Sequence, residues 1–306
     1  MRDIHDPIFT DENAAREHLE SVQWPNGPVC PHCGSMDRIA KMEGASYRPG
    51  LYHCASCRRQ FTVTVGTVYE RSKIPLHKWL LATFLLCSSK KGMSAHQLHR
   101  MLKVTYKTAW FMEHRIREGM RDDAPGGLGG SGKVVEADET YFGDKDVVTK
   151  RTKRGKSGLA SKRAVLGLVE RGGKVRTVHI ATVSANNVAD LVRRNLSRES
   201  RLMTDESKLY IKVGAEFVQH QSVTHSAEEY VRGDVHTNTI EGYFSVFKRG
   251  MRGIYQHCGE AHLHRYLSEF DFRYNTRAKL GFSDAMRTVI ALEGIRGKRL
   301  TYRRAD

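Results

Sequence analysis

Four of the six cysteines form two Cys-X-X-Cys pairs, and this spacing limits the fold of the N-terminal part more than any other feature. The pairs are Cys30 with Cys33 and Cys54 with Cys57, and twenty residues lie between them. Each pair presents two thiolates on a tight turn, and two such turns joined by a small β-ribbon complete a tetrahedral site for one structural Zn²⁺. A module this small buries little apolar surface, so the metal is expected to supply much of its folding free energy. Redox-active pairs are the alternative, but four thiolates leave no open coordination position, which favours a folded binding module over a zinc enzyme.

The charge balance favours a polyanionic partner. The 306 residues carry a formal net charge of +16, and the hydrophobic content of 40% is typical of a globular chain. Proteins that bind nucleic acid commonly have such an excess, although ribosomal and membrane-surface proteins share it. The longest apolar run, Trp79 to Cys87, has nine residues, whereas a membrane span needs roughly 20. The N-terminus has no apolar segment of the kind that secretory signals contain, so we expect a cytoplasmic protein without a membrane partner.

Hydrophobic periodicity separates a helical first part of the chain from a second part with mixed strands and helices. The expected helices of the first part are 11–22, 76–88, 94–102 and 107–120, and a strand is expected over 60–69. Residues 123–133 contain five glycines and one proline and are expected to be an interdomain linker. In the second part we expect strands over 134–141, 163–170, 175–183 and 200–205, and helices over 187–196, 239–249 and 262–274. This order predicts a layered α/β domain rather than an all-helical one.

A helix-turn-helix is the preferred interpretation of the two helices expected between Met93 and Met120. Apolar residues recur on one side of each helix, and residues 105–108 stand where a recognition helix would begin and meet DNA. On this interpretation Lys107 and Arg115 are expected to contact DNA. The alternative is a helical hairpin that only packs, with its basic side chains forming a solvated face.

Three carboxylates stand out by their positions. Asp138 lies inside the apolar strand VVEADETYF, where a carboxylate costs free energy unless it is paired or binds a metal. Asp205 follows the short apolar strand RLMT, and ligand sites of open α/β sheets gather at such strand ends. Glu241 lies in a predicted helix, with thirty-five residues between it and Asp205. If the three converge, they can hold two Mg²⁺ or Mn²⁺ ions, which would clamp the attacking and leaving oxygens of an in-line phosphoryl displacement.

Helix geometry places two further candidates beside Glu241. Lys248 follows it by seven residues, nearly two full turns, so both side chains project from one face. Asn238 precedes it by three residues and can share that face. Lys248 is expected to hold a DNA phosphate or a terminal base.

These segments resemble a known family. The strand VEADETYFG, the TDE at Asp205 and the stretch HTNTIEGYFSVFKRGMRGIYQHCGEAHLHRYLSEFDFRYNTR are similar to the DDE transposases of bacterial insertion sequences. The segments CPHCGS and YHCASCRRQFTVTVGTVYERSKIPLHKW are similar to the zinc ribbon of the ISXO-like group, and HQLHRMLKVTYKTAWFMEHRIR matches its helical region. The resemblance extends from about Gly27 to Gly281. It implies a ribonuclease-H-like catalytic fold and a strand-transfer activity that depends on divalent metal.

The resemblance also implies roles for individual residues. Asp138 is the first catalytic aspartate, Asp205 the second and Glu241 the third acid, and all three would bind the Mg²⁺ or Mn²⁺ ions. Lys248 matches the lysine that follows the glutamate by seven residues. Some relatives have asparagine as the third ligand, which keeps Asn238 open as a participant.

Other residues near the acids are expected to have other roles. Glu136 and Thr140 share the strand face of Asp138 by the two-residue period, whereas Glu139 points away. Glu136 and Glu139 are expected to be structural or surface residues. Among the histidines that precede the last helix region, His236 is the best candidate for a phosphate contact.

A basic run follows the first aspartate strand. Residues 150–163 contain seven basic side chains and no acid, and we expect them to contact the DNA backbone, with a solvated loop as the alternative. The residues expected at the DNA are Lys107, Arg115, Lys150, Arg151, Lys153, Arg154, Lys248 and Arg249.

The expected organisation has five segments. They are an N-terminal helix with the zinc ribbon (1–69), a helix-turn-helix region (70–122), a Gly-rich linker (123–133), the ribonuclease-H-like catalytic domain (134–290) and a basic C-terminal tail (291–306).

The predicted function is that of a DNA transposase. The ribbon and the helix-turn-helix would bind the terminal inverted repeats of the mobile element, and the catalytic domain would cut the strand at the element end. The freed 3′-hydroxyl would then attack target DNA with no covalent protein–DNA intermediate. Cuts at two ends must be coordinated, so a nucleoid-associated homo-oligomer on DNA is expected. The alternatives are a sequence-specific DNA-binding regulator and a structure-specific nuclease on the same fold.

Overall fold

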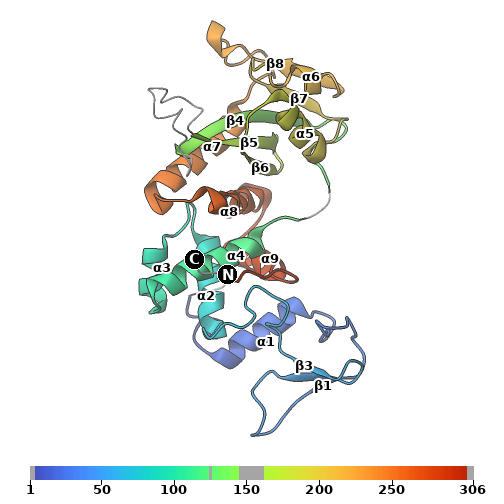
Figure 1. The fold of residues 1–306 in the computed structure, drawn as a ribbon, viewed down its shortest axis with the longest axis vertical. Helices are drawn as coiled ribbons and strands as arrows, with labels where there is room; N and C mark the ends of the chain where they lie inside the picture. Colours follow the sequence, from blue (N-terminus) through green and yellow to red (C-terminus); the bar gives the residue numbers. More distant parts are fainter. Residues whose placement is uncertain (1–3, 124–125, 145–161, 302–306) are drawn as a thin grey trace. The chain divides into compact units, whose positions relative to one another are not determined.

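The protein forms two compact units, which are described separately below (Figure 1). The computed structural model describes residues 4–123, 126–144 and 162–301. The first unit comprises Met1–Arg121 together with Gly281–Asp306, and the second comprises Asp122–Leu280. None of the helices in the described ranges combines the length and the apolar character that a membrane crossing requires.

The first unit contains the expected helices and one that was not expected. They are α1 (Glu12–Gln23), α2 (Leu76–Ser88), α3 (Ala95–Leu102), α4 (Tyr106–Met120) and α9 (Asp284–Glu293). Asp11 begins α1 as its N-cap, because its side chain accepts a hydrogen bond from the Ala14 N–H at 2.7 Å. Helix α9 packs against α1, α2 and α4. A Cβ at Gly294, directly after α9, would lie 2.2 Å from the Gly119 carbonyl oxygen of α4, so only glycine permits this approach.

A small antiparallel sheet precedes these helices. Its strands are β1 (Ile39–Lys41), β2 (Tyr52–Cys54) and β3 (Arg59–Phe61), in the order β1-β2-β3. The strand prediction for residues 60–69 is wrong beyond Phe61. The chain turns there instead, with the Val65 N–H donating to the Thr62 carbonyl and Gly66 in the left-handed region at φ +74°. Phe61 and Val63 are buried and Val65 is half-buried, but the residues after Phe61 lie in turns rather than in an extended strand.

The second unit is built on a five-stranded mixed sheet. Its strands are β4 (Val134–Asp144), β5 (Lys162–Glu170), β6 (Val175–Ile180), β7 (Arg201–Thr204) and β8 (Gln219–Ser222), in the order β6-β5-β4-β7-β8. Strands β4, β5 and β6 form an antiparallel meander, and the predicted turn at 171–174 connects the last two. Strand β7 pairs parallel with β4, and β8 pairs parallel with β7. Three antiparallel strands followed by parallel ones give the ribonuclease-H-like fold that was expected.

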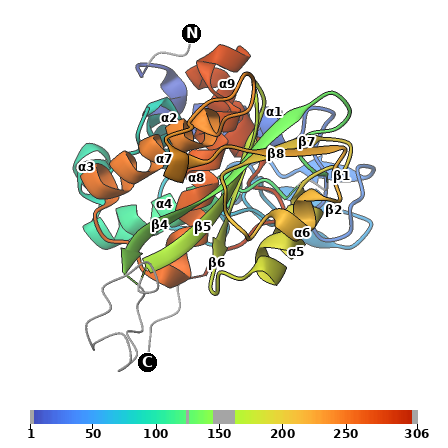
Figure 2. The ribbon, with the colours of Figure 1, turned by 90° about the horizontal axis from the view of Figure 1, so that it is seen from above.

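Helices cover both faces of this sheet (Figure 2). Helices α5 (Ala185–Asn195) and α6 (Ile211–Gly214) lie on one face, and α7 (Asn238–Gly250) and α8 (Leu263–Asn275) lie on the other. Val135 and Ala137 of β4 belong to the core under α5, whereas Phe142 belongs to the core under α7. A Cβ at Gly167 of β5 would lie 2.6 Å from Ile240 Cδ1, so this glycine allows α7 to pack closely on the sheet.

Two segments pack differently from what the sequence suggested. Leu128, inside the Gly-rich segment 123–133, is buried in the core of the second unit, and its N–H donates to the Asn195 carbonyl at 2.7 Å. The described residues 126–133 therefore lie along the sheet domain instead of spanning free solvent. Residues 281–290, which the sequence placed with the catalytic domain, include most of α9 and pack in the first unit.

Candidate active site

The four cysteines of the ribbon come together as the sequence predicted. The sulfur atoms of Cys30 and Cys57 are 3.6 Å apart, those of Cys33 and Cys54 are 3.7 Å apart, and all four lie within 4.8 Å of one another. A tetrahedral site with Zn–S bonds of about 2.3 Å needs sulfur atoms about 3.8 Å apart. The donor set and its spacing therefore fit one structural Zn²⁺.

The local backbone prepares this cluster for a cation. Gly34 closes the first turn in the left-handed region at φ +76°, and its N–H donates to the Cys30 carbonyl. The N–H of Cys57 lowers the pKa of Cys54 to about 6, whereas burial raises the pKa of Cys57, so the thiolate that a metal requires is favoured at Cys54 and not at Cys57. The apolar support is small and consists of Tyr52 stacked on Phe61 with the Trp24 ring edge-on to both.

The pairing of β4 with β7 places the first two acids at one edge of the sheet. These strands are parallel neighbours, and Glu136 is opposite Met203 in the register. Asp138 and Asp205 each come two residues later, so both carboxylates lie beyond the same point of the pairing. Each is oriented by a nearby amide, since the Glu139 N–H donates to Asp138 at 2.7 Å and the Ser207 N–H donates to Asp205 at 3.0 Å.

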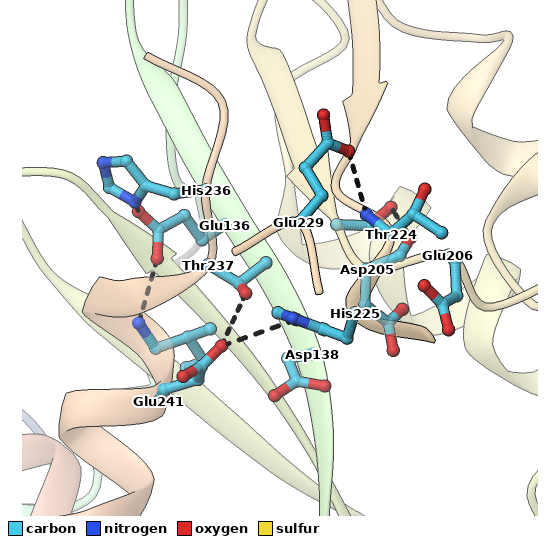
Figure 3. Close-up of polar contacts among 12 residues, drawn as sticks. Glu136, Asp138, Asp205, Glu206, Thr224, His225, Glu229, His236, Thr237 and Glu241 are labelled. Atoms are coloured by element: carbon cyan, nitrogen blue, oxygen red, sulfur yellow. Dashed lines mark hydrogen bonds and ion pairs between the residues drawn. The ribbon is translucent and has the colours of Figure 1, made fainter. Parts of the chain in front are cut away.

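The third acid, Glu241, is contributed by a helix instead of a strand. Glu241 lies in the first turn of α7, and the Thr237 hydroxyl donates to its Oε1 at 2.8 Å. The His225 Nε2 lies 3.7 Å from the same oxygen. In Figure 3 the side chains of Asp138, Asp205 and Glu241 point toward one common space, with His225 between the two strand ends and the helix.

Asp138 lies in the electrostatic field of the other two acids. Burial, reinforced by the charges of Asp205 and Glu241, raises the pKa of Asp138 to about 7. Burial also raises the pKa of Glu139 to about 7. Within the described residues, the cysteine cluster is the one group of three or more Cys, His, Asp or Glu ligand atoms that all lie within 4.8 Å. The charges of Asp205 and Glu241 therefore act on Asp138, but the ligand atoms of the three acids do not all lie within 4.8 Å of one another.

A cavity of about 420 Å³ is lined by Asp138 and Glu241 together with basic side chains, whereas Asp205 does not line it. Its lining residues are Asp138, Glu139, Thr140, Glu241, Phe244, Ser245, Lys248, Arg249 and Arg252. Glu241 and Lys248 line it together, as the seven-residue spacing predicted for one helix face. Asn238, the alternative third ligand, is exposed at the start of α7 and does not line this cavity.

Several expected DNA contacts have other surroundings. Arg115 is buried, and its guanidinium donates to the carbonyl oxygens of Leu300 and Glu70, so its position favours a structural role over a DNA contact. The side chain of His236 lies beside Glu136, with Nδ1 at 3.3 Å from Oε1. Lys107 is exposed at the start of α4. The expected contacts Lys150, Arg151, Lys153 and Arg154 lie outside the described residues.

Sequence reasoning missed some residues of this region. Arg252 lines the cavity from the π-helical turn Met251–Tyr255, which the helical periodicity did not reveal. The contact between His225 and Glu241 was not expected either, because loop histidines have no periodic signal. Glu136 was expected to be a structural or surface residue, and its carboxylate is fully buried. Its two-residue spacing from Asp138 indicated that both side chains lie on the same face of the strand.

Comparisons with known proteins identify the family of the chain. Residues 128–275 match the profile of the ISXO2-like transposase domain, and residues 10–60 match the transposase zinc-ribbon domain. The chain is 30% identical over 298 residues to an uncharacterized protein in transposable element ISH50 of Halobacterium salinarum, covering 92% of this chain and 97% of that protein.

The ribbon, the sheet topology and the acidic edge together define a transposase with a ribonuclease-H-like DDE domain and an N-terminal zinc ribbon. Within that class, the chain belongs to the ISXO2-like transposase family.

A solved structure gives a weaker likeness. A simian T-cell lymphotropic virus intasome, determined in complex with the PP2A regulatory subunit B56 gamma, aligns with 57% of this chain and 67% of its own at 12% identity. The TM-score is 0.28, a value too low to support an argument about fold or function.

The zinc site predicts a specific loss on removing one ligand. Cys54→Ala should abolish the single equivalent of bound Zn²⁺ and expose the ribbon to protease, because the apolar cluster around it is small. Elemental analysis and limited proteolysis would measure both effects. Cys258→Ser, in the second unit, should keep one equivalent of zinc; retention of zinc by the Cys54 variant would contradict the assignment.

The raised pKa of Asp138 predicts a pH-dependent stability in metal-free buffer. The folded state holds a proton on this group up to about pH 7, whereas an unfolded aspartate loses it near pH 4. Its contribution to stability is therefore present below pH 4 and is lost as the pH rises toward 7. Asp138→Asn should gain several degrees in Tm over the unmodified protein across this interval. Asp190→Asn, on the exposed surface of α5, should not, and a pH-independent difference for Asp138→Asn would refute the explanation.

Proposed function

We propose that this transposase cuts and joins DNA at the edge formed by Asp138, Asp205 and Glu241, with two Mg²⁺ or Mn²⁺ ions as cofactors. The observation that carries the proposal is that Asp138 feels the charges of Asp205, on the neighbouring parallel strand, and of Glu241, on a distant helix, while Asp138 and Glu241 line a cavity together with basic side chains. Catalysis of phosphoryl transfer needs both parts, a site for cations and a surface that holds the phosphate backbone.

The residues present fit such a pair of ions. A carboxylate whose pKa is raised by burial and by like charges is relieved when a cation binds. Three carboxylates can share two ions about 3.5–4 Å apart. When bound, the ions would polarise the phosphoryl oxygen and activate the attacking oxygen.

The protein's own groups orient the reaction. The N–H groups of Glu139 and Ser207 and the hydroxyl of Thr237 each hold one of the acids in place, so the site is organised before DNA enters. Lys248, Arg249 and Arg252 lie at the other end of the cavity and would bind the backbone of the strand to be cut.

The first unit would select the DNA ends. The Thr105 side chain caps α4 by accepting from the Thr108 N–H, and Lys103 makes the turn from α3 in the left-handed region at φ 51°. This short turn presents Lys107 and Tyr106 at the exposed start of α4, as a recognition helix requires. We propose that this helix pair and the zinc ribbon bind the terminal inverted repeats, and that a homo-oligomer brings the two ends together.

Removing an acid should abolish the chemistry without removing DNA binding. Asp138→Ala or Asp205→Ala should lower strand transfer in Mn²⁺ by about 10³-fold, since several kcal/mol of transition-state stabilisation depend on the ions. The measurement is strand transfer on an element-end duplex, with end binding followed in parallel. Asp190→Asn should stay within about twofold of the unmodified protein.

The same assay separates the alternatives. A regulator would bind the ends but show no metal-dependent cleavage in the unmodified protein. A structure-specific nuclease would cleave branched DNA without preferring the element end. Wild-type activity in either alanine variant would show that the acids do not form the active site.

The basic end of the cavity predicts a change in salt dependence. Lys248→Ala should weaken DNA binding and reduce the slope of log K against log salt by about 0.9, the value for one phosphate contact. Titrations at several salt concentrations would measure the slope. Lys212→Ala, on α6 at the opposite face of the sheet, should leave the slope unchanged. An unchanged slope in the Lys248 variant would remove this residue from the DNA path.

A further inference from the structure

A fully buried carboxylate stands between the strand of the first acid and the helix of the third. Glu136 lies on β4 two residues before Asp138, and 0% of the residue is exposed. Its oxygens accept hydrogen bonds from the Thr239 N–H at 2.8 Å, the Ile240 N–H at 3.0 Å and the Thr239 hydroxyl at 2.8 Å. Strand β4 is thus bonded directly to the first turn of α7 (Figure 3).

Helix α7 takes this cap from another element because its own N-cap is used elsewhere. Thr237 makes no capping hydrogen bond with its side chain, and its hydroxyl donates to Glu241 instead. The first-turn amides of a helix have no partner within the helix, and a carboxylate there also interacts favourably with the helix dipole. Glu136, on the sheet, both accepts hydrogen bonds from these amides and places a carboxylate at the start of the helix.

An arginine completes the connection. The Arg171 Nε donates to Glu136 Oε1 at 2.6 Å, while its two terminal nitrogens donate to the carbonyl oxygens of Asp234 and His236. Arg171 begins the turn between β5 and β6, so it ties the hairpin to the segment that leads into α7. The buried charge of Glu136 is therefore paired and fully hydrogen-bonded, as burial of a charge requires.

We infer that Glu136 is a positioning residue, which sets the location of Glu241 and Lys248 relative to Asp138. Glu136 and Asp138 share one face of one strand, and Glu241 directly follows Ile240, whose N–H bonds Glu136. Any slip between β4 and α7 at this point changes the separation of the first and third acids. The inference rests on the proposed function, because it assigns Glu136 to the geometry of that metal site.

Glu136→Gln tests this role at constant side-chain size. The amide cannot accept from every donor that faces it, because its NH₂ group would meet either Arg171 or the α7 amides. We expect Mn²⁺ affinity to fall by about 10- to 100-fold, the usual effect of losing a group that orients metal ligands. Strand-transfer kcat should fall while KM for DNA stays nearly constant. Mn²⁺ titration followed by electron paramagnetic resonance measures the affinity without relying on activity.

A matched control separates positioning from general loss of stability. Glu269 is equally buried on α8 and bonds Tyr255 and Arg273, away from the acids. Glu269→Gln should lower Tm by a comparable amount and leave Mn²⁺ affinity unchanged. If Glu136→Gln does not fold, Thr239→Val removes one of its hydrogen bonds and should weaken Mn²⁺ binding by a smaller factor.

The outcomes distinguish the two proposals. Folded Glu136→Gln with unchanged Mn²⁺ affinity overturns the positioning role, as does an equal loss of affinity in Glu269→Gln. The same conclusion follows if only Thr239→Val folds and its affinity is unchanged. If the unmodified protein binds no Mn²⁺, the proposed function fails, and the positioning role fails with it.

Discussion

The parallel pairing of β4 with β7 is the constraint on which the catalytic unit depends. Side chains two residues beyond paired positions must emerge at the same edge, so Asp138 and Asp205 meet although 66 residues separate them in sequence. The pairing is itself maintained by burial, since Val135 and Leu202 lie completely inside the core under α5. A one-residue slip would turn every side chain of a strand to the other face. The position of the two carboxylates is therefore determined by apolar packing remote from the acids themselves.

The third acid depends on a different kind of contact. Helix α7 is fixed along its length by the apolar face formed by Ile240, Phe244 and Phe247, which packs against β5 and α8. Apolar contacts are not directional, so they set the distance of the helix from the sheet better than its position along the strand. Hydrogen bonds from the start of the helix to Glu136 fix the position of the helix along the strand, because hydrogen bonds are directional. Packing and hydrogen bonding thus have separate roles, and the distance between acids depends on both.

Sequence patterns could predict the parts of this protein that depend on local chemistry. The spacing of the cysteines predicts the zinc site, and the apolar runs predict β4, β5, β7 and α7 with boundaries correct to within a few residues. Contacts between distant segments were not accessible in the same way. Strand β8 has the polar sequence QHQS at an edge of the sheet, where alternation is not required. Helix α9 packs with helices of Met1–Arg121, although the whole second unit, Asp122–Leu280, lies between them in sequence. Arg115 looked like a surface cation because its partners, the carbonyl oxygens of Leu300 and Glu70, leave no mark in the sequence.

The packing around the cysteine cluster differs from the packing around the acidic edge. Apart from two of the cysteines, the buried cluster of the ribbon contains Tyr52 and Phe61 alone, so its strands have little to hold them together unless the thiolates share a cation. The acidic edge is attached to a sheet with extensive cores on both faces, so the fold can hold carboxylates together without a metal. Holding a buried carboxylate beside other acids disfavours its ionised form, and burial together with these charges raises the pKa of Asp138 to about 7. A divalent cation bound there, as the proposed function requires, would relieve this repulsion without being needed for the fold, whereas a structural zinc site needs its ion to stay folded.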